Sequence, residues 1–316
     1  MDQTTLIINR VLPILLLIGL GSWIRQRQFL TEATIDELRK VVVNITLPAV
    51  LFISFLDIEL ELTYFVVFVV MYLLCIVLFG FGRQVQARLD VQYEYFPFVM
   101  TGFEYGMLGV SLFGSAYGLD KIGYIAVIDL GHEIFIWSFF LSLLLMRRDG
   151  ISQTGQLVRA VFQSPVMIAI MAGILFNLLG IQEFLYERAV TGGVMATLVF
   201  LSNLTIPLIL VIVGYGIKLD WQGARESVVV IAIRMVVLLP LALILSKVFI
   251  GGLLDMEKPF QAAFFTLLIL PPPFIVPLYM RPGNPDERRY INNVLTLYTI
   301  VTIVIFSIYF VLNPEL

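Results

Sequence analysis

Long apolar runs separated by short polar connections follow one another along the whole chain. Ten such runs lie near residues 6–24, 40–56, 63–82, 96–117, 122–146, 159–179, 189–217, 227–250, 260–279 and 289–312. An α-helix rises about 1.5 Å per residue, so roughly 20 apolar residues cross about 30 Å of hydrocarbon. The pattern predicts an all-α polytopic membrane protein with ten transmembrane helices.

The polar stretch between the first two runs has the signature of a helix start. Thr31 precedes Glu32, Asp36 and Glu37, which places a capping side chain and acidic residues at a helix N-terminus. We expect this piece to lie at the membrane interface and to lead into the second span.

The ninth run is interrupted by four prolines within residues 270–277. Proline has no backbone N–H and clashes with the preceding turn, so one continuous helix cannot pass through this stretch. At bilayer depth, non-helical backbone is tolerated only inside protein or beside a water-filled cavity. We therefore expect two half-helices, with a binding site where they separate.

Two short patterns recur in the two halves of the chain. The pentapeptide Asn-x-Thr-(Leu/Ile)-Pro occurs at residues 44–48 and again at residues 203–207, 159 positions later. The pair Pro13 and Gly21 is repeated, at the same spacing, by Pro165 and Gly173. These matches predict two structural repeats, residues 1–150 and 151–316, joined by a linker near residues 153–156.

Five spans in each repeat would place the two copies in opposite orientations. Inverted repeats form substrate sites near the midplane, where their discontinuous helices meet. The fourth run, the counterpart of the ninth, should therefore be broken as well. It contains Gly102, Glu104, Gly106 and Gly109. Close packing of glycines in an unbroken helix is the alternative.

The distribution of Lys and Arg predicts the orientation in the membrane. The connections after the odd-numbered runs carry 14 of these residues, the opposite side carries 5, and Arg234 lies within a span. Both termini should then be outside or periplasmic, in a multi-pass protein of the plasma or inner membrane.

Composition supports this class of protein and removes others. The chain is 59% hydrophobic and has a formal net charge of −3, which gives no reason to expect nucleic acid as a partner. The one cysteine, Cys75, has no intrachain partner for a disulfide. The start Met1-Asp2-Gln3 lacks a basic region, so the first run is expected to be a retained span.

Several segments in order resemble the auxin efflux carrier family, which includes plant PIN carriers and bacterial malate and malonate permeases. The similar segments are residues 11–19, 47–49, 109–112, 117–118 and 272–277, and the resemblance covers nearly the whole chain. It implies the fold of the PIN carriers and of the bile acid/sodium symporters, in which two inverted five-helix repeats cross at broken spans four and nine. It also implies a scaffold part, a mobile part and elevator-type alternating access.

Two positions depart from the family pattern. Glu104 stands where members commonly carry Asn, and Ser111 stands where they commonly carry Pro. A carboxylate at the crossing would repel an organic anion unless it is protonated or neutralised. The sign of the substrate and the identity of the coupling ion stay open at this point.

Ionisable residues within spans are costly and need a partner, a cavity or a function. Asp129, His132 and Glu133 share one helical face through their i, i+3, i+4 spacing. We interpret them as a protonatable cluster for ion or proton coupling, with a structural hydrogen-bond role as the alternative. A zinc-peptidase motif is excluded because Ile136 occupies the position of its second histidine. No metal or cofactor is expected.

Further residues near the breaks are candidates for contacting the substrate. Arg234 offers a bidentate clamp for a carboxylate, although pairing with an acid of the fifth span, or reaching the cytoplasmic face, are alternatives. The amides of the repeated pentapeptides are substrate ligands or cover carbonyls freed by proline. The full set is Asn44, Glu104, Tyr105, Ser111, Asn203, Arg234, Pro272 and Pro277.

These observations favour a secondary transporter of small organic anions, with protons or sodium as the coupling ion. Membrane lipid is a further partner, and a homodimer is allowed. One alternative is a cation-coupled carrier or antiporter of the same fold, and another is a membrane receptor that binds its ligand without moving it. An enzyme is disfavoured because no nucleophile and base pair or metal set is found.

Overall fold

The structure, a computed structural model, describes residues 3–59, 61–149, 164–217, 224–281 and 284–314, and within these ranges it contains helices and no strand. Seven helical segments are long and apolar enough to cross a membrane. They are Ile8–Gln26, Glu32–Asp57, Thr63–Arg88, Leu119–Arg148, Ala189–Gly216, Arg225–Leu253 and Pro285–Leu312. The chain is therefore a polytopic all-α membrane protein, as its apolar runs predict.

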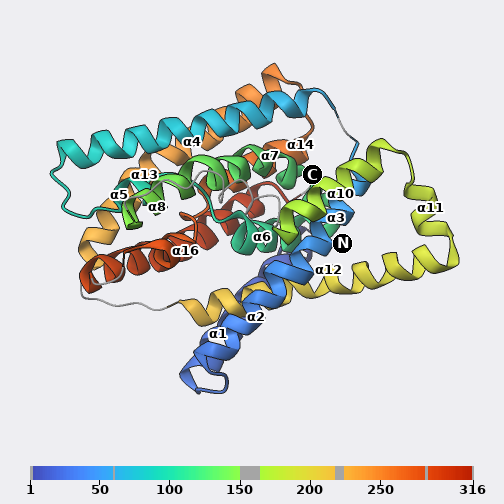
Figure 1. Ribbon diagram of the computed structural model, residues 1–316, viewed down its shortest axis with the longest axis horizontal. Helices are drawn as coiled ribbons and strands as arrows, with labels where there is room; N and C mark the ends of the chain where they lie inside the picture. The colour runs from blue at the N-terminus through green and yellow to red at the C-terminus, as the bar shows by residue number, and fades with distance from the viewer. Residues whose placement is uncertain (1–2, 60, 150–163, 218–223, 282–283, 315–316) are drawn as a thin grey trace.

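The helices follow the predicted runs closely (Figure 1). In the first half they are α1 (Gln3–Gln26), α2 (Glu32–Val41), the π-helix η1 (Val42–Thr46), α3 (Leu47–Asp57), α4 (Thr63–Arg88), α5 (Phe96–Val99), the π-helix η2 (Tyr105–Gly109), α6 (Val110–Tyr117), the 3₁₀ turn η3 (Leu119–Lys121), α7 (Ile122–Phe135), the π-helix η4 (Ile136–Phe140) and α8 (Leu141–Asp149). In the second half they are α10 (Pro165–Leu178), α11 (Gln182–Glu187), α12 (Ala189–Gly216), α13 (Ala224–Ile244), the π-helix η5 (Leu245–Leu253), α14 (Lys258–Ile269), α15 (Val276–Tyr279) and α16 (Pro285–Leu312).

In the part of the chain that it describes, the structure has seven membrane-length helical segments where the sequence has ten apolar runs, and the difference in number has a physical reason. The fourth and ninth runs are each divided into shorter helices, so neither provides one membrane-length helix. The sixth run is represented by α10, a helix of 14 residues. The start of that run and the expected linker at residues 153–156 lie outside the described residues.

The helix start at Thr31 is confirmed. The Thr31 side chain accepts a hydrogen bond from the backbone N–H of Thr34, as an N-cap does. The helix does not stop at the interface, because α2 continues through η1 into α3. Pro48 is the second residue of α3 and directly follows the π-helical turn η1.

The helices pack as two groups. In the first group, α1 packs along α12 and α3 packs along α10. In the second, α4 packs on α7, α13 packs on both α14 and α16, and α14 packs on α7. Figure 1 shows α1 with α12 below, and α4, α7 and α16 above and to the left. The interrupted segments lie within the second group.

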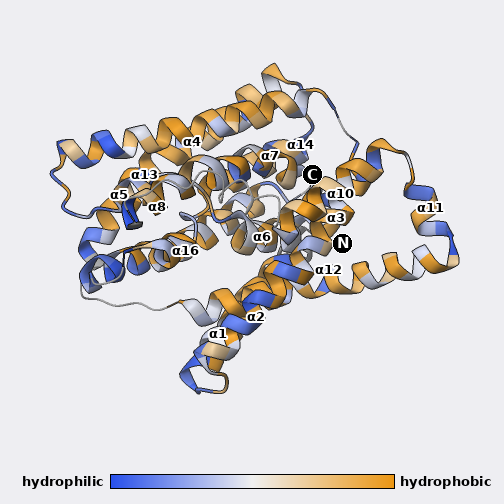
Figure 2. Cartoon of the chain, in the orientation of Figure 1, coloured by the Kyte–Doolittle hydropathy of each residue, from blue (hydrophilic) through white to orange (hydrophobic). Residues whose placement is uncertain are grey.

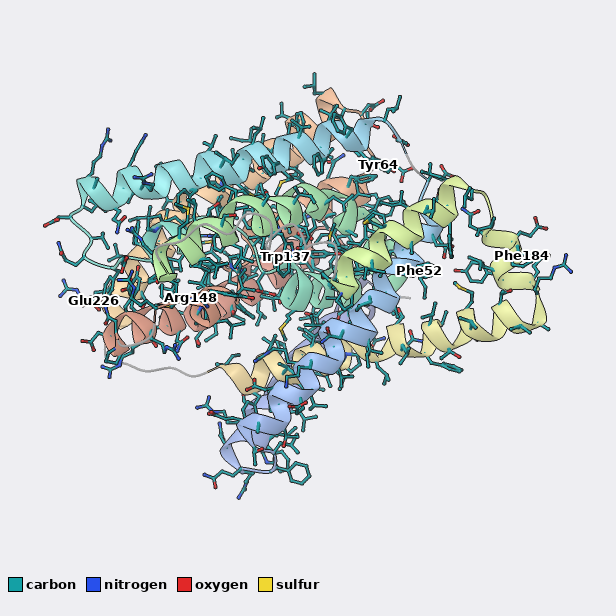
Figure 3. The ribbon with its side chains drawn as sticks, in the orientation of Figure 1. Phe52, Tyr64, Trp137, Arg148, Phe184 and Glu226 are labelled. Carbon is teal, nitrogen blue, oxygen red and sulfur yellow. The ribbon has the colours of Figure 1, made fainter. Side chains whose placement is uncertain are left out.

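Polar residues are concentrated at the helix ends. Figure 2 shows hydrophilic residues at the left ends of α4, α13 and α16 and at the tip that joins α1 to α2. Figure 3 places Arg148 and Glu226 at this left end and Tyr64 at the opposite side. Of the connections that the sequence predicts to be cytoplasmic, those at the polar ends of α4, α13 and α16 lie at the left of this view, and the one between α1 and α2 lies at the lower tip.

Candidate functional site

Two helix interruptions meet inside the second group of helices. The predicted break at residues 270–277 is confirmed, because α14 ends at Ile269 and α15 begins at Val276. The break inferred for the fourth run is confirmed too, since α5 ends at Val99 and η2 begins at Tyr105. The two linkers between these ends cross in contact with each other.

Gly102 allows the linkers to approach closely. Its φ of +70° lies in the left-handed region, and a Cβ atom placed on it would lie 2.7 Å from Cγ of Pro273. A side chain at this position would be strained by the backbone conformation and would meet the proline ring. The fourth break thus depends on a glycine that accommodates one of the prolines of the ninth.

Glu104 joins the two linkers through its backbone and its side chain. Its backbone N–H donates to the Pro271 carbonyl at 2.8 Å. One carboxylate oxygen accepts from the N–H of Phe274 at 2.6 Å, and the other accepts from the N–H of Met107 at 3.2 Å. The side chain is 9% exposed. Both interrupted segments therefore donate a backbone N–H to one carboxylate.

Arg234, on α13, binds backbone carbonyls of both interrupted segments. Its five N–H donors reach the Tyr298 hydroxyl and the carbonyls of Val99, Thr101, Gly102 and Leu270. Its guanidinium carbon lies 5.2 Å from the ring centroids of both Phe103 and Tyr298. The residue is 1% exposed.

These contacts show which groups Arg234 binds in this structure. Val99 and Leu270 stand at the C-terminal ends of α5 and α14, where carbonyls lack helical partners. The cation satisfies these carbonyls and complements the negative ends of the helices. Its donors go to carbonyls and a hydroxyl, and it does not pair with an acid of the fifth span or reach the surface.

Asp129 and His132, on α7, are both buried and lie beside the crossing. Nδ1 of His132 lies 2.7 Å from Oδ1 of Asp129, and Nε2 lies 2.9 Å from the backbone nitrogen of Phe103. A backbone N–H can only donate, so Nε2 accepts, and the proton of the neutral imidazole is on Nδ1. The pair therefore fixes the linker at Phe103.

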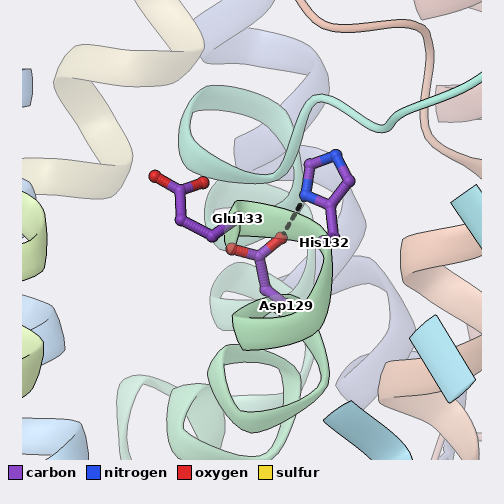
Figure 4. A group of neighbouring side chains, drawn as sticks. All are labelled: Asp129, His132 and Glu133. Carbon is purple, nitrogen blue, oxygen red and sulfur yellow. Dashed lines mark hydrogen bonds and ion pairs between the residues drawn. The ribbon is translucent and has the colours of Figure 1, made fainter. Parts of the chain in front are cut away.

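Glu133 completes the predicted cluster and is half-buried. It accepts from Nε1 of Trp137 at 2.7 Å. Figure 4 shows the three side chains on one side of α7, and their ligand atoms lie within 4.8 Å of one another. Both ring nitrogens of His132 already have hydrogen-bond partners, so the arrangement does not present a ready set of metal ligands.

The remaining candidates differ in how close they come to the crossing. Tyr105 is 5% exposed, and its hydroxyl has no hydrogen-bond partner among the described residues. The Ser111 hydroxyl is buried and donates within its own helix, to the carbonyl of Met107 or Leu108. Pro272 is buried in the second break, and Pro277 is half-buried in the first turn of α15.

The asparagines of the repeated pentapeptides are exposed, on η1 and α12. The Asn44 amide donates to the Lys40 carbonyl at 2.8 Å, one turn earlier. The threonines of the same motif are buried instead, and Thr46 has no side-chain partner among the described residues. Because η1 contacts α12, and α12 contacts η2, the motifs lie on elements next to the crossing.

The sequence did not single out four groups that the site uses. These are the rings of Phe103 and Tyr298 and the backbone N–H groups of Met107 and Phe274. The position of Phe103 directly before Glu104 was the one available signal. The backbone donors follow from the path of the linkers, which residue types alone do not specify.

A separate pocket of about 410 Å³ lies at the end of the molecule where α3 ends and α4, α7 and α14 begin. Among its described lining residues, six are acidic and none is basic. The acidic residues are Asp57, Glu59, Glu61, Asp120, Asp255 and Glu257. This end is opposite the polar ends of α4, α13 and α16, which carry predicted cytoplasmic connections.

Helices of membrane length surround two crossed interruptions, and a buried carboxylate and a buried guanidinium lie at the crossing. The chain is therefore a polytopic membrane protein with a polar centre. The chain is 27% identical over 223 residues to an uncharacterized transporter of Methanothermobacter thermautotrophicus, an alignment that covers 69% of the chain and 70% of that relative. No family model matches the chain.

Proposed function

We propose that this protein is a secondary active transporter of small organic anions in the plasma or inner membrane, coupled to protons. The observation that carries the proposal is the pair of backbone N–H groups, one from each interrupted segment, that bind the Glu104 carboxylate. Such a site has the geometry for a carboxylate, as charge-assisted hydrogen bonds to backbone donors require. The similarity to a transporter supports movement of the ligand over simple binding.

An inverted repeat of ten spans is part of this proposal. If the first five spans correspond to the last five, the contact of α1 with α12 has the contact of α10 with α3 as its counterpart, and both occur. The matched glycines behave alike, since Gly21 packs on the backbone of Val211 and Gly173 packs on the backbone of Phe52. Two halves that make corresponding contacts support a common origin for the two breaks.

The two groups of helices would supply the parts of an elevator. We assign α1, α3, α10 and α12 to the scaffold, and the group that contains the crossing to the mobile part. The candidates for reaching the substrate from that side are Asn203, exposed on α12, which contacts η2, and Asn44, exposed on η1, which contacts α12. Tyr105 is the candidate from the mobile part, whereas Arg234 positions the linkers.

The cluster on α7 is proposed to serve proton movement next to the crossing. Glu133 is its half-buried member and Asp129 its buried one, so the cluster extends from a more accessible position toward the linker at Phe103. His132 connects this linker to Asp129, because it accepts a hydrogen bond from the Phe103 N–H and donates one to Asp129.

Transport by purified protein in liposomes tests the proposal. We expect uptake of at least one of labelled malate, malonate and an indole carboxylate, and an increase in that uptake when a pH gradient is imposed. Flux of none of the three would contradict the anion assignment and would favour a receptor or a different substrate.

A cation-coupled carrier or antiporter is the second candidate, and the acidic pocket favours it. Six carboxylates, with no basic residue among the described lining residues, would concentrate cations in that pocket. A sodium gradient imposed without a pH gradient distinguishes the two, because it drives uptake only in the second case.

The orientation can be measured with single cysteines, since Cys75 is fully buried and should not react in the folded protein. Gln28→Cys and Gln92→Cys lie in connections predicted to be cytoplasmic, and Glu183→Cys lies on the opposite side. An impermeant maleimide added to intact cells should label only the last of these. Labelling of the first two alone would reverse the orientation.

A further inference from the structure

We propose that Glu104 couples anion transport to protons by occupying the site that the substrate carboxylate needs. This inference rests on the proposed function. The Glu104 carboxylate competes with the substrate carboxylate for the same donors. While Glu104 is ionised, it accepts hydrogen bonds from both backbone N–H groups. The substrate carboxylate binds to these groups after Glu104 is protonated and moves away.

The first step of the argument is geometric. The two carboxylate oxygens of Glu104 use the N–H of Phe274 and the N–H of Met107, one each. Glu104 also precedes a helical stretch of 13 residues, formed by η2 and α6, whose N-terminus favours negative charge. The donors that would make this crossing an anion site are therefore already bound to an anion.

The second step concerns the charges that face Glu104. Asp129, His132 and Glu133 on α7 interact with the charge of Glu104. Arg234 on α13 and the Tyr298 hydroxyl on α16 lie at the adjoining linkers. The facing part of the α14–α15 linker, residues 270–275, contains no titratable group. Arg234 directs its five donors to carbonyls and Tyr298.

This arrangement cannot hold two ionised carboxylates at the same donors. A second anion would repel Glu104 in a buried environment, where screening by water is weak. A proton on Glu104 removes its charge and turns one of its oxygens into a donor. The bond from one backbone N–H is then lost and the other becomes a weaker, neutral hydrogen bond, so that a substrate carboxylate can displace the side chain. One proton is thus taken up for each substrate carboxylate bound, and it is released again when the substrate leaves and Glu104 returns.

A second observation is a polar group on η2, near the α7 carboxylates Asp129 and Glu133, that has no hydrogen-bond partner among the described residues. The hydroxyl of Tyr105, next to Glu104 in the chain, is buried and without a hydrogen-bond partner among the described residues. Buried hydroxyls normally have a partner, so this one is available to a bound ligand. A substrate carboxylate provides the acceptor that it lacks.

The first experiment measures proton uptake by the wild-type protein in weakly buffered detergent solution, with a pH indicator. The probe is whichever of malate, malonate and the indole carboxylate the wild type transports. We expect proton uptake when the anion binds, approaching one proton per anion as the pH is raised from 7 to 9 and Glu104 of the free protein becomes fully ionised. Binding of the anion without proton uptake overturns the proposal and leaves the transport function standing.

The second experiment compares Glu104→Gln with the wild type in proteoliposomes. We expect the variant to exchange labelled for unlabelled substrate across the membrane but to lose accumulation driven by a pH gradient. Glu287→Gln is the matched control, because Glu287 is also a buried carboxylate that accepts a backbone N–H, from Tyr95 at 2.7 Å, outside the crossing. It should accumulate substrate as the wild type does.

The possible outcomes decide the proposal as follows. If Glu104→Gln accumulates substrate in response to the pH gradient as the wild type does, Glu104 is not the coupling residue. Loss of coupling in Glu133→Gln alone assigns that role to the cluster on α7. If Glu104→Gln does not fold, the number of protons that the wild type takes up per bound anion still tests the proposal. Absence of flux of all three probes through the wild type removes the proposed function and this inference with it.

Discussion

The backbone N–H of Phe103 donates to Nε2 of His132 at 2.9 Å, and this bond determines the state of the imidazole. Because Nε2 accepts, His132 carries its proton on Nδ1 and donates it to Asp129. Protonation of Nε2 would break the bond to Phe103. Within this conformation, His132 thus holds the linker in place, and it changes its charge only if the linker moves.

Nitrogen-15 NMR of the labelled histidine in lipid nanodiscs tests this assignment. His132 is the one histidine of the chain, so its signals need no assignment by mutation. We expect the chemical shifts of a neutral imidazole protonated at Nδ1, unchanged between pH 6 and pH 8. Shifts of an imidazolium, or of the tautomer protonated at Nε2, would contradict the hydrogen bond to Phe103.

Replacement of Arg234 should affect stability strongly. Lysine keeps the charge but has three donors in place of five and lacks the planar geometry, so buried carbonyls lose their partners. We expect Arg234→Lys to destabilise the protein by about 2–4 kcal/mol, which thermal unfolding in detergent would measure as a lower Tm. Arg225→Lys is the control, because Arg225 is exposed on the same helix. Equal Tm values for both variants would refute the role of Arg234.

The two breaks differ in how directly the sequence reveals them. Four prolines in residues 270–277 exclude a continuous helix by local chemistry alone. The fourth run has no proline between residues 98 and 117, and its break could be inferred only through the repeat. Its cause is non-local, because Gly102 adopts a left-handed conformation against Pro273, more than 150 positions away.

The role of Arg234 illustrates what residue types do not reveal. The sequence shows a cation within a span and acids in other spans, which leaves an ion pair, a substrate clamp and the cytoplasmic face as alternatives. Its partners are instead backbone carbonyls at the ends of α5 and α14. Every residue has a carbonyl, so these acceptors are identified only once the helix ends are placed in space.

The repeated glycines give a prediction about packing. A Cβ atom on Gly21 would lie 2.1 Å from the Val211 carbonyl oxygen, and one on Gly173 would lie 2.7 Å from the Phe52 carbonyl oxygen. We expect Gly21→Ala and Gly173→Ala each to destabilise the protein by about 1–3 kcal/mol, since helix backbones would have to separate. Thermal unfolding in detergent measures the effect.

Gly19 provides the control within the same helix. A Cβ atom there would meet nothing within 4 Å, so Gly19→Ala should leave the Tm unchanged or raise it. The correspondence between the halves would be weakened if only one of Gly21 and Gly173 showed the loss of stability.

Tyr105 and Tyr117 should respond in opposite ways to removal of the hydroxyl. The Tyr105 hydroxyl has no partner among the described residues, so Tyr105→Phe should leave the Tm unchanged. If the hydroxyl binds substrate, the variant should show a KM for the transported anion raised about three- to tenfold, the value of one neutral hydrogen bond. The Tyr117 hydroxyl donates to the Asn313 carbonyl at 3.2 Å, so Tyr117→Phe should lower the Tm and leave KM unchanged. An unchanged KM in Tyr105→Phe would show that the open hydroxyl is not a substrate contact, because the two variants remove the same atom and differ only in its partner.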